Sequence, residues 1–447
     1  MTTASEPLYH VTSLSNFARG FDKYTRRYRK GGIPESRYPN ESYLLTAPDL
    51  AVGVAKASKL RDKLRIPGDE LLVLQTSVSR ASVVPNPRTG IGLLWPSPDL
   101  PIAGVFRVDP LGKLGSALGL EEAMARSLEL HASSFAAYAD LRPRSLSFLP
   151  IARGCQAACP FCFSEASVST DQEQGRFEMK GARAWIDLAR RRGAERAVIT
   201  GGGEPTLLPH ARLLELVNAC NKDFDKVVLI TNGVRFASAP AAAAATQLGE
   251  LCEAGLSVLA VSRHHHEEAI NAKLMNLETE TPALMQLCAA NRDRLSGMRL
   301  RLICVLQRGG VESVGDIQNY VGWAASLGVD DVCFKELYVS TSEESVYHSR
   351  STNAWSAKNQ VSLSIVADWA GHCGFEVVDR LPWGAPIFRG VTGGRCIRVA
   401  AYTEPSLFWE RSTGIARSWN VMSDGACLAS LEDRRSKLEL CSAACDH

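Results

Sequence analysis

Short apolar runs alternate with helical periodicity through the middle of the chain. The runs are rich in β-branched residues and lie at 146–151, 197–200, 227–230, 257–261, 300–306 and 332–334. Between them, apolar residues recur at the spacing of a helix face, as in Met179, Ala182, Ile186 and Ala189. Strands that are apolar throughout are typical of parallel sheets covered by helices. The pattern predicts an α/β protein whose six β/α units form a partial (β/α)6, TIM-like barrel.

The two ends of the chain have different patterns. Residues 1–140 combine Pro, Gly and Ser punctuation with short strands and one helical stretch, which predicts a separate N-terminal α/β domain. The barrel is expected to span residues 141–380. Residues 381–447 are rich in loops, and we expect them to form a C-terminal extension that contains Cys396, Cys427, Cys441 and Cys445.

Composition excludes several classes of protein. The 447 residues are 45% hydrophobic and 22% charged, and the net charge of +2 gives no electrostatic reason to expect nucleic acid or an acidic membrane as partner. The first ten residues lack the pattern of a signal peptide, and no apolar run is long enough to span a membrane, so we expect a cytoplasmic protein. The 13 cysteines then indicate metal ligands or buried thiols in place of disulfides.

Three cysteines follow the first predicted strand within a few positions. Cys155, Cys159 and Cys162 lie on a segment too irregular for a helix. Three thiolates can hold three irons of a four-iron, four-sulfur cluster and leave the fourth iron open to an outside ligand. Zinc is an alternative, although structural zinc sites generally add a second cysteine pair or histidines. Incidental buried thiols are the other alternative, and the spacing favours the cluster over both.

The spacing Cys-x3-Cys-x-aromatic-Cys, with Phe161 at the aromatic position, resembles that of the radical S-adenosylmethionine superfamily. This resemblance implies a [4Fe-4S] cluster whose open iron binds S-adenosylmethionine. It also implies reductive cleavage to a 5′-deoxyadenosyl radical, which would take hydrogen from a peptide or natural-product intermediate. The reductant would be a protein such as flavodoxin or ferredoxin. The protein's own part would be to position and shield the reacting groups.

A second motif follows the next predicted strand, where the superfamily has Gly-Gly-Glu-Pro. The resemblance implies that this segment holds the methionine end of the cofactor. Consecutive glycines let the backbone approach a ligand closely, and a carboxylate can accept hydrogen bonds from an ammonium group. A plain tight turn is the alternative. The residues concerned are Gly202, Gly203, Glu204 and Pro205.

Polar residues also end the third and fourth predicted strands, where ligands collect in β/α barrels. By resemblance, Asn232, Ser262 and Arg263 would contact the cofactor, although Asn232 precedes a glycine and could simply form a turn. The run 264–266 is three histidines. We do not expect a metal site there, because adjacent residues on a strand or helix face different ways. His264 is the candidate for a substrate contact.

The sixth predicted strand resembles a segment of the molybdenum-cofactor cyclase branch of the superfamily. That resemblance places Lys335 and Glu336 near the substrate, with a surface ion pair as the alternative, and Arg299 and Arg301 are further polar candidates. This branch and the peptide-modifying relatives with SPASM or twitch extensions bind an auxiliary iron–sulfur cluster. By resemblance, its ligands here would be Cys396, Cys427, Cys441 and Cys445, with buried thiols as the alternative.

The N-terminal segment around His10 resembles the opening of ADP-ribosyltransferase-like domains. A buried, hydrogen-bonded histidine in a strand is the alternative for His10, and we favour a substrate-docking role for this domain. Two functions therefore compete with a radical enzyme. One is an iron–sulfur or zinc-binding module without radical chemistry. The other is an ADP-ribosyltransferase-like activity in the N-terminal domain.

Overall fold

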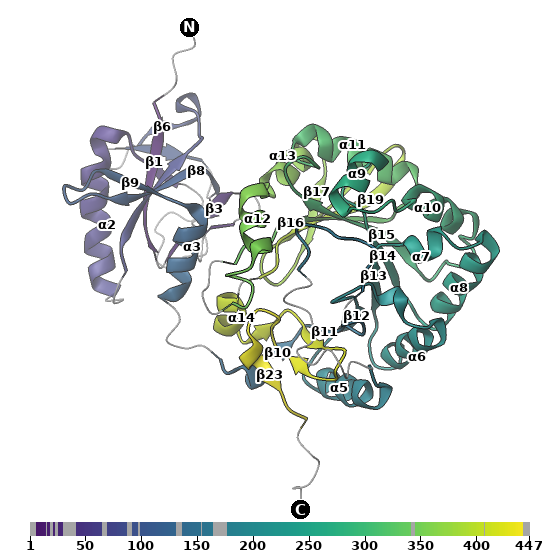
Figure 1. Cartoon of the computed structure of the whole chain (residues 1–447). Helices are drawn as coiled ribbons and strands as arrows, with labels where there is room; N and C mark the ends of the chain where they lie inside the picture. Colours follow the sequence, from purple (N-terminus) through teal and green to yellow (C-terminus); the bar gives the residue numbers. More distant parts are fainter. Residues whose placement is uncertain are drawn as a thin grey trace, which may run out of the picture. The chain divides into compact units, whose positions relative to one another are not determined.

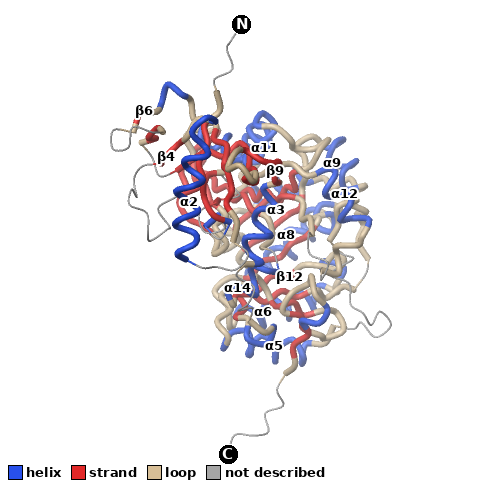
Figure 2. Tube along the Cα trace, turned by 90° about the vertical axis from the view of Figure 1, so that its left-hand side faces the viewer, coloured by secondary structure: helices blue, strands red, loops and turns tan. Residues whose placement is uncertain are grey.

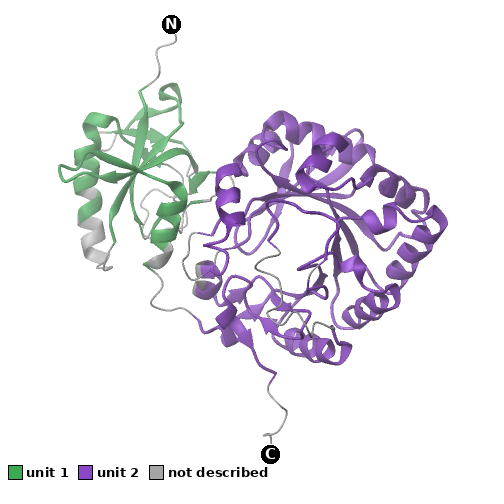
Figure 3. Cartoon of the chain, in the orientation of Figure 1, with its two compact units in different colours: residues 1–135 green, residues 136–447 purple. Residues whose placement is uncertain are grey.

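The computed structural model describes residues 6–14, 16–17, 21–22, 26–29, 42–64, 69–86, 92–96, 99–130, 136–152, 154–163, 177–340, 345–405 and 407–440. The chain divides into two compact units, Met1–Phe135 and Ala136–His447 (Figure 3). Among the described helices, none combines the length and the apolar character that crossing a bilayer requires.

The first unit is built on an antiparallel sheet with the strand order β1-β5-β8-β3-β2, and β9 pairs with β8. Alternation along β5 places Leu72 and Leu74 in one core cluster and Val73 in another, so both faces of the sheet are covered. His10 on β1 is buried, and its Nδ1 lies 2.9 Å from the carbonyl oxygen of Tyr43. The elements are β1 (Leu8–Ser13), β2 (Phe21–Asp22), β3 (Arg27–Arg29), β4 (Ser42–Leu44), α2 (Leu50–Leu64), β5 (Leu71–Thr76), β6 (Val84–Pro85), β7 (Leu93–Trp95), β8 (Asp99–Val108), β9 (Leu114–Leu118) and α3 (Leu120–Glu129).

The second unit contains a twelve-stranded sheet in which six consecutive strands are parallel neighbours in chain order. Each of the six predicted apolar runs forms one of them, so the prediction of a parallel barrel-like sheet is confirmed. Every pair in this series is parallel, with registers such as Leu146 opposite Ala197. The strands are β11 (Ser145–Phe148), β12 (Arg196–Ile199), β13 (Val227–Thr231), β14 (Val258–Ser262), β15 (Arg299–Leu306) and β16 (Asp331–Glu336).

Helices connect these strands and lie on the outer side of the sheet (Figure 1, Figure 2). The first crossover helix, α5, buries the predicted face with Met179, Ala182, Ile186 and Ala189, and Trp185 joins them. Because these strands are parallel, their C-terminal ends lie on one edge of the sheet. The helices are α5 (Met179–Arg191), α6 (His210–Asn221), α7 (Val234–Ala237), α8 (Ala241–Glu253), α9 (Glu268–Met275), α10 (Thr281–Ala290), α11 (Val314–Ser326), α12 (Ser351–Asn359) and α13 (Ser364–His372).

Residues after 380, which the sequence analysis treats as a separate extension, join the same sheet. Strand β19 pairs in parallel with β16, and β21 pairs in parallel with β11, so this segment continues the barrel at both of its edges. A β-hairpin and short strands complete it. The elements are β17 (Glu376–Arg380), β18 (Pro386–Thr392), β19 (Arg395–Tyr402), α14 (Leu407–Thr413), β20 (Ile415–Ala416), β21 (Trp419–Val421), β22 (Cys427–Leu428) and β23 (Lys437–Leu438), with β10 (Arg142–Pro143) beside β20.

Candidate active site

The three motif cysteines lie on a loop that follows β11 at the C-terminal edge of the barrel. Gly154 directly precedes the first motif cysteine and has a φ of 103°, which residues other than glycine rarely adopt. Cys155 and Cys162 are exposed and Cys159 is half-buried. The backbone N–H of Cys162 donates to the carbonyl of Cys159 at 3.1 Å, so a tight turn brings these two thiols to the same part of the loop.

The three thiols are close enough to affect one another electrostatically. Burial raises the pKa of Cys159 to about 12, and the neighbouring thiols of Cys162 and Cys155 contribute to the increase. Burial also raises the pKa of Cys155. Three thiolates held together are therefore unfavourable without a compensating positive charge, which iron would supply. The donor set fits a metal cluster for this reason.

The glycine motif packs directly against the cysteine loop. The N–H groups of Gly203 and Glu204 donate to the carbonyls of Ile151 and Gly154, at 3.1 and 2.9 Å. A Cβ at position 203 would lie 2.1 Å from the carbonyl oxygen of Gly154, so no larger residue fits there. Gly202 is buried in the same turn, and Pro205 begins a short 3-10 turn behind it. The two predicted motifs thus form one structure.

Glu204 is 3% exposed and its carboxylate is hydrogen-bonded within the protein. One oxygen accepts from the N–H and hydroxyl of Thr206 and from the hydroxyl of Thr231, and the other accepts from the N–H of Asn232 at 2.8 Å. These bonds join the loop after β12 to the end of β13. The expected contact with an ammonium group stays a prediction, and what the structure adds is this bracing of the loop.

Asn232 contacts the cysteine loop and also forms the turn that was its alternative role. Its Nδ2 donates to the side-chain oxygen of Gln156 at 3.0 Å and lies 3.8 Å from the sulfur of Cys155. Its Oδ1 accepts from the N–H of Val234, and Gly233 has a φ of 80°. A single side chain therefore positions the end of β13 against the first cysteine.

Arg263 does not face the site, contrary to the sequence-based expectation. The side chain is fully buried, and its guanidinium donates to the carbonyls of His265 and His266 and to the carboxylate of Glu268. It also lies over the ring of Trp323. A guanidinium whose donors are used in this way stabilises the loop after β14 and has none directed at a cofactor. Ser262, by contrast, is the last residue of β14 and is partly exposed, so its predicted cofactor contact stays a prediction.

His264 supports the aromatic residue of the cysteine motif. Its Nδ1 accepts from the N–H of Val305 at 3.1 Å, and its ring meets Phe161 edge to face with centroids 4.9 Å apart. Burial lowers the pKa of His264 to about 3, with further lowering by Arg263 and Lys335, so this imidazole is neutral. Sequence reasoning expected a substrate contact here, whereas the structure shows a packing contact with Phe161.

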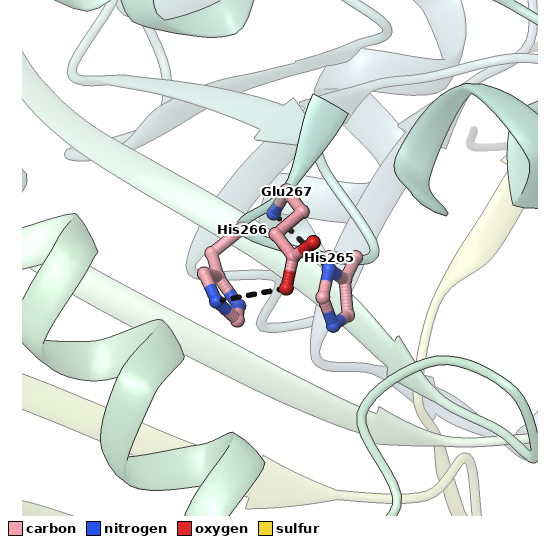
Figure 4. A group of neighbouring side chains, drawn as sticks. All are labelled: His265, His266 and Glu267. Carbon is pink, nitrogen blue, oxygen red and sulfur yellow. Dashed lines mark hydrogen bonds and ion pairs between the residues drawn. The ribbon is translucent and has the colours of Figure 1, made fainter. Parts of the chain in front are cut away.

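The next three residues gather more closely than the sequence suggested. The ligand atoms of His265, His266 and Glu267 lie within 4.8 Å of one another, because a loop and not a regular element holds them (Figure 4). The N–H of Glu267 donates to Nδ1 of His265 at 3.1 Å, which leaves the neutral ring with its proton on Nε2. His265 could bind a metal through Nδ1 only by giving up that hydrogen bond, and through Nε2 only after the Nε2 proton has left. The expectation that these three side chains face different ways is therefore wrong, because the loop brings their ligand atoms together.

A cavity of about 640 Å³ extends from the cysteine loop into the barrel. Phe161 and Cys162 line one part of it, and Lys335 and Glu336 line another, while the contact of Lys335 and Glu336 with a substrate stays a prediction. Lys335 forms an ion pair with Glu404 at 2.7 Å, and Arg417 contacts the other oxygen of that carboxylate at 2.5 Å. Glu404 and Arg417 were not predicted from sequence, because Glu404 follows β19 and Arg417 precedes β21, and both strands join the barrel through pairing distant in sequence.

The proposed ligands of an auxiliary cluster are not brought together by the described residues. Cys427 is fully buried and lies opposite Val421, the last residue of β21, at the C-terminal edge of the sheet. Cys396 is exposed and precedes Arg398, which lies opposite the first residue of β16, at the N-terminal edge. One cluster cannot bind both thiols in this arrangement, which corrects the prediction for this pair. Cys441 and Cys445 lie outside the described residues.

The fold is a partial parallel barrel, and the loop at its C-terminal edge carries three thiols of the kind that ligate metal clusters. Residues 149–292 match the model of the Radical SAM superfamily, so this part of the chain is a radical SAM domain. The cofactors of this family are a [4Fe-4S] cluster and S-adenosylmethionine. The match supports the superfamily, and the narrower assignment to the cyclase branch stays a prediction.

Comparison with solved structures gives low scores. SuiB from Streptococcus suis, bound to S-adenosylmethionine, has a TM-score of 0.43 and 16% identity, and the match covers 73% of this chain and 69% of SuiB. Coproporphyrinogen III oxidase (HemN) from Escherichia coli, a radical SAM enzyme, has a TM-score of 0.36 and 14% identity, with 56% of each chain covered. No curated protein matches the sequence significantly. Scores this low do not bear on the substrate.

Proposed function

We propose that Cys155, Cys159 and Cys162 hold a [4Fe-4S] cluster, and that the enzyme takes hydrogen from a peptide or natural-product intermediate bound in the barrel. The observation that supports this most strongly is the packing of two motifs into one site. The cysteine loop and the glycine loop share backbone hydrogen bonds, and Cys162 lines the barrel cavity. Such a site can hold a cofactor and a substrate next to each other.

When bound, the cluster and S-adenosylmethionine supply a 5′-deoxyadenosyl radical, formed when one electron from an external reductant breaks a carbon–sulfur bond. The chain's own residues have to hold the reactants and exclude water. Phe161, packed on His264 and near Trp355, places an apolar ring next to the third cysteine in the sequence. The turn at Gly202 and Gly203 lets the backbone pack closely on the cysteine loop, and the methionine end of the cofactor would bind beside this turn. A flavodoxin or ferredoxin is the proposed electron donor.

Anaerobic reconstitution tests this function. The protein, treated with iron, sulfide, reductant and S-adenosylmethionine, is expected to release 5′-deoxyadenosine. Cys159→Ala is expected to reduce that product to background, since two thiolates cannot hold three irons of the cluster. Bound iron and product are measured in the same samples.

Cys373→Ala is the matched control, because Cys373 is an exposed thiol outside the motif. It is expected to keep both bound iron and product. An unreactive wild-type protein that nevertheless binds iron would be a binding module and would contradict the proposal. Consumption of a nicotinamide dinucleotide that persists in Cys159→Ala would instead support the N-terminal transferase.

A further inference from the structure

Basic side chains gather where the barrel strands begin, at the edge opposite the cysteine loop. Two of them directly precede β11 and β13, and two lie at or near the start of β12 and β15. The fifth, on β19, lies opposite the first residue of β16. All five line the same cavity of about 640 Å³. We call them the basic patch, and they are Arg144, Arg196, Lys226, Arg301 and Arg398.

The basic patch has few anions to balance it. Arg301 pairs with Asp331 at 2.9 Å, and Arg398 lies 3.7 Å from the other oxygen of the same carboxylate. Asp331 is 4% exposed, and the Nε of Arg398 is buried without a hydrogen-bond partner among the described residues. Within the described part of the chain, Arg144, Arg196 and Lys226 form no ion pair within 4.0 Å. Glu195 and Asp379 also line the cavity, but neither forms an ion pair with these three cations among the described residues.

The cations of the patch also disfavour one another. Burial lowers the pKa of Lys226 to about 8, and the nearby guanidinium groups of Arg301 and Arg196 lower it further. Burial likewise lowers the pKa of Arg144 to about 10, with Arg196 adding to the effect and Glu195 and Asp379 opposing it. Positive charge concentrated in this way is unfavourable in the ligand-free protein, and an anion would relieve it.

The patch lies in the cavity that also reaches the cysteine loop. Val198, Val228 and Ile303 line the space between them, so an apolar layer separates the two polar ends. Along β15, the step from Arg301 to Val305 is four residues, or about 13 Å of strand. A molecule held at the patch by one end can therefore extend toward the cysteine loop with the other.

We propose that the basic patch binds a multiply charged oxyanion of the phosphate type, and that this group anchors one end of the substrate in the barrel. One carboxylate would neutralise a single cation, whereas a phosphate group bears about −1.5 to −2 charges and offers three acceptor oxygens. Arginine matches such oxyanions with paired donors. The anchoring rests on the proposed function, but anion binding by the patch does not.

Calorimetric titration of the full chain with inorganic pyrophosphate tests the binding. Wild-type protein is expected to bind one pyrophosphate, and Lys226→Gln and Arg196→Gln are each expected to weaken binding about tenfold, since a charge-assisted contact is lost. Lys222→Gln is the matched control, because Lys222 is exposed and lies four residues away on the outside. It is expected to bind like the wild type. No binding by the wild type, or an equal loss in Lys222→Gln, would overturn the site.

A second arm uses ribose 5-phosphate, whose phosphate belongs to a larger molecule. Binding at least as tight as that of pyrophosphate supports the anchoring of a substrate, whereas binding of pyrophosphate alone overturns it. Thermal unfolding adds a readout that a purely structural lysine would not give. Lys226→Gln is expected to raise the melting midpoint without anion, because repulsion is relieved, and a lower midpoint contradicts the proposal.

The two proposals fail in distinguishable ways. Pyrophosphate binding needs neither cluster nor S-adenosylmethionine, so it is measured on the protein without them. If the wild type releases 5′-deoxyadenosine and binds no anion, anion binding by the basic patch is refuted and the proposed function stands. If the wild type binds pyrophosphate and releases no 5′-deoxyadenosine, the basic patch is an anion-binding site, but its proposed role as a substrate anchor is refuted.

Discussion

At the scale of single residues, two buried carboxyl groups in the C-terminal segment stand out. Glu410 on α14 is 5% exposed and accepts from the N–H of Arg417 at 2.7 Å, and Glu432 is 7% exposed. Burial raises the pKa of Glu410 to about 8 and that of Glu432 to about 7. Both groups therefore hold protons in the folded protein at a pH where exposed carboxyl groups have lost them.

This protonation predicts how stability depends on pH. The folded state binds these protons more tightly than the unfolded state, so the free energy of unfolding falls as pH rises from about 4.5 to about 8. Glu410→Gln is expected to flatten this decline, because the amide imitates the protonated acid. The effect is measured as the midpoint of denaturant-induced unfolding, determined at intervals of about one pH unit between pH 5 and pH 8.

The control for this prediction is Glu253→Gln, which changes an exposed carboxylate of the same unit. It is expected to retain the wild-type slope. Equal slopes for Glu410→Gln and the wild type would show that Glu410 does not contribute to the decline.

At the scale of elements, the glycine loop and the cysteine loop support each other across neighbouring strands. The glycine loop donates two backbone hydrogen bonds to the cysteine loop, and the close approach at Gly203 leaves no room for a side chain. Asn232, from the end of β13, adds a third contact through Gln156. The geometry of the three thiols is therefore set partly by residues from neighbouring strands.

Gly203→Ala tests this dependence. Its methyl group would force the backbone carbonyl of Gly154 to move, so we expect less iron to be retained after reconstitution and a drop in 5′-deoxyadenosine of roughly tenfold or more. Gly181→Ala is the matched change, because a Cβ there meets nothing within 4 Å and the residue lies inside helix α5. That variant is expected to keep its iron and to gain about 0.5–1 kcal/mol in stability. Iron retained equally in both variants would contradict the interdependence of the loops.

At the scale of the whole molecule, the chain consists of two units with separate hydrophobic cores. The core clusters of the first unit contain only residues before 136, and those around the barrel contain only residues after it. A unit with its own core can in principle fold alone. The candidate site also lies wholly in the second unit, since every residue that lines the cavity comes from it.

Residues 136–447, produced without the first unit, are therefore expected to unfold cooperatively and to release 5′-deoxyadenosine after reconstitution. Circular dichroism during heating and product analysis check the two expectations. A fragment that shows no unfolding transition would mean that the barrel requires the first unit for stability.

Much of the barrel and part of the site could be predicted from sequence. The six strands were predictable because each apolar run is local and its neighbour in the sheet is also its neighbour in sequence. The order of strands at the two edges was not predictable, because β19 and β21 pair with strands far earlier in the chain. For the same reason, the partners of Lys335 and the basic residue Arg398 escaped the sequence analysis.

Arg263 shows the limit for a single side chain. Its position at the end of a strand indicated a site residue, but only packing decided that its guanidinium turns toward the loop carbonyls of His265 and His266. Cys396 and Cys427 show the same limit for a pair. Their shared segment suggested a common cluster, and the strand register placed them at opposite edges.

The sequence by itself determined the class of the protein, because the spacing of three thiols and the alternation of strand and helix are local properties of the chain. Only the tertiary structure decided which side chains face the cavity and which charges lack partners. Those properties depend on residues that are distant in sequence and meet only when the sheet has formed, and the basic patch is a consequence of that assembly.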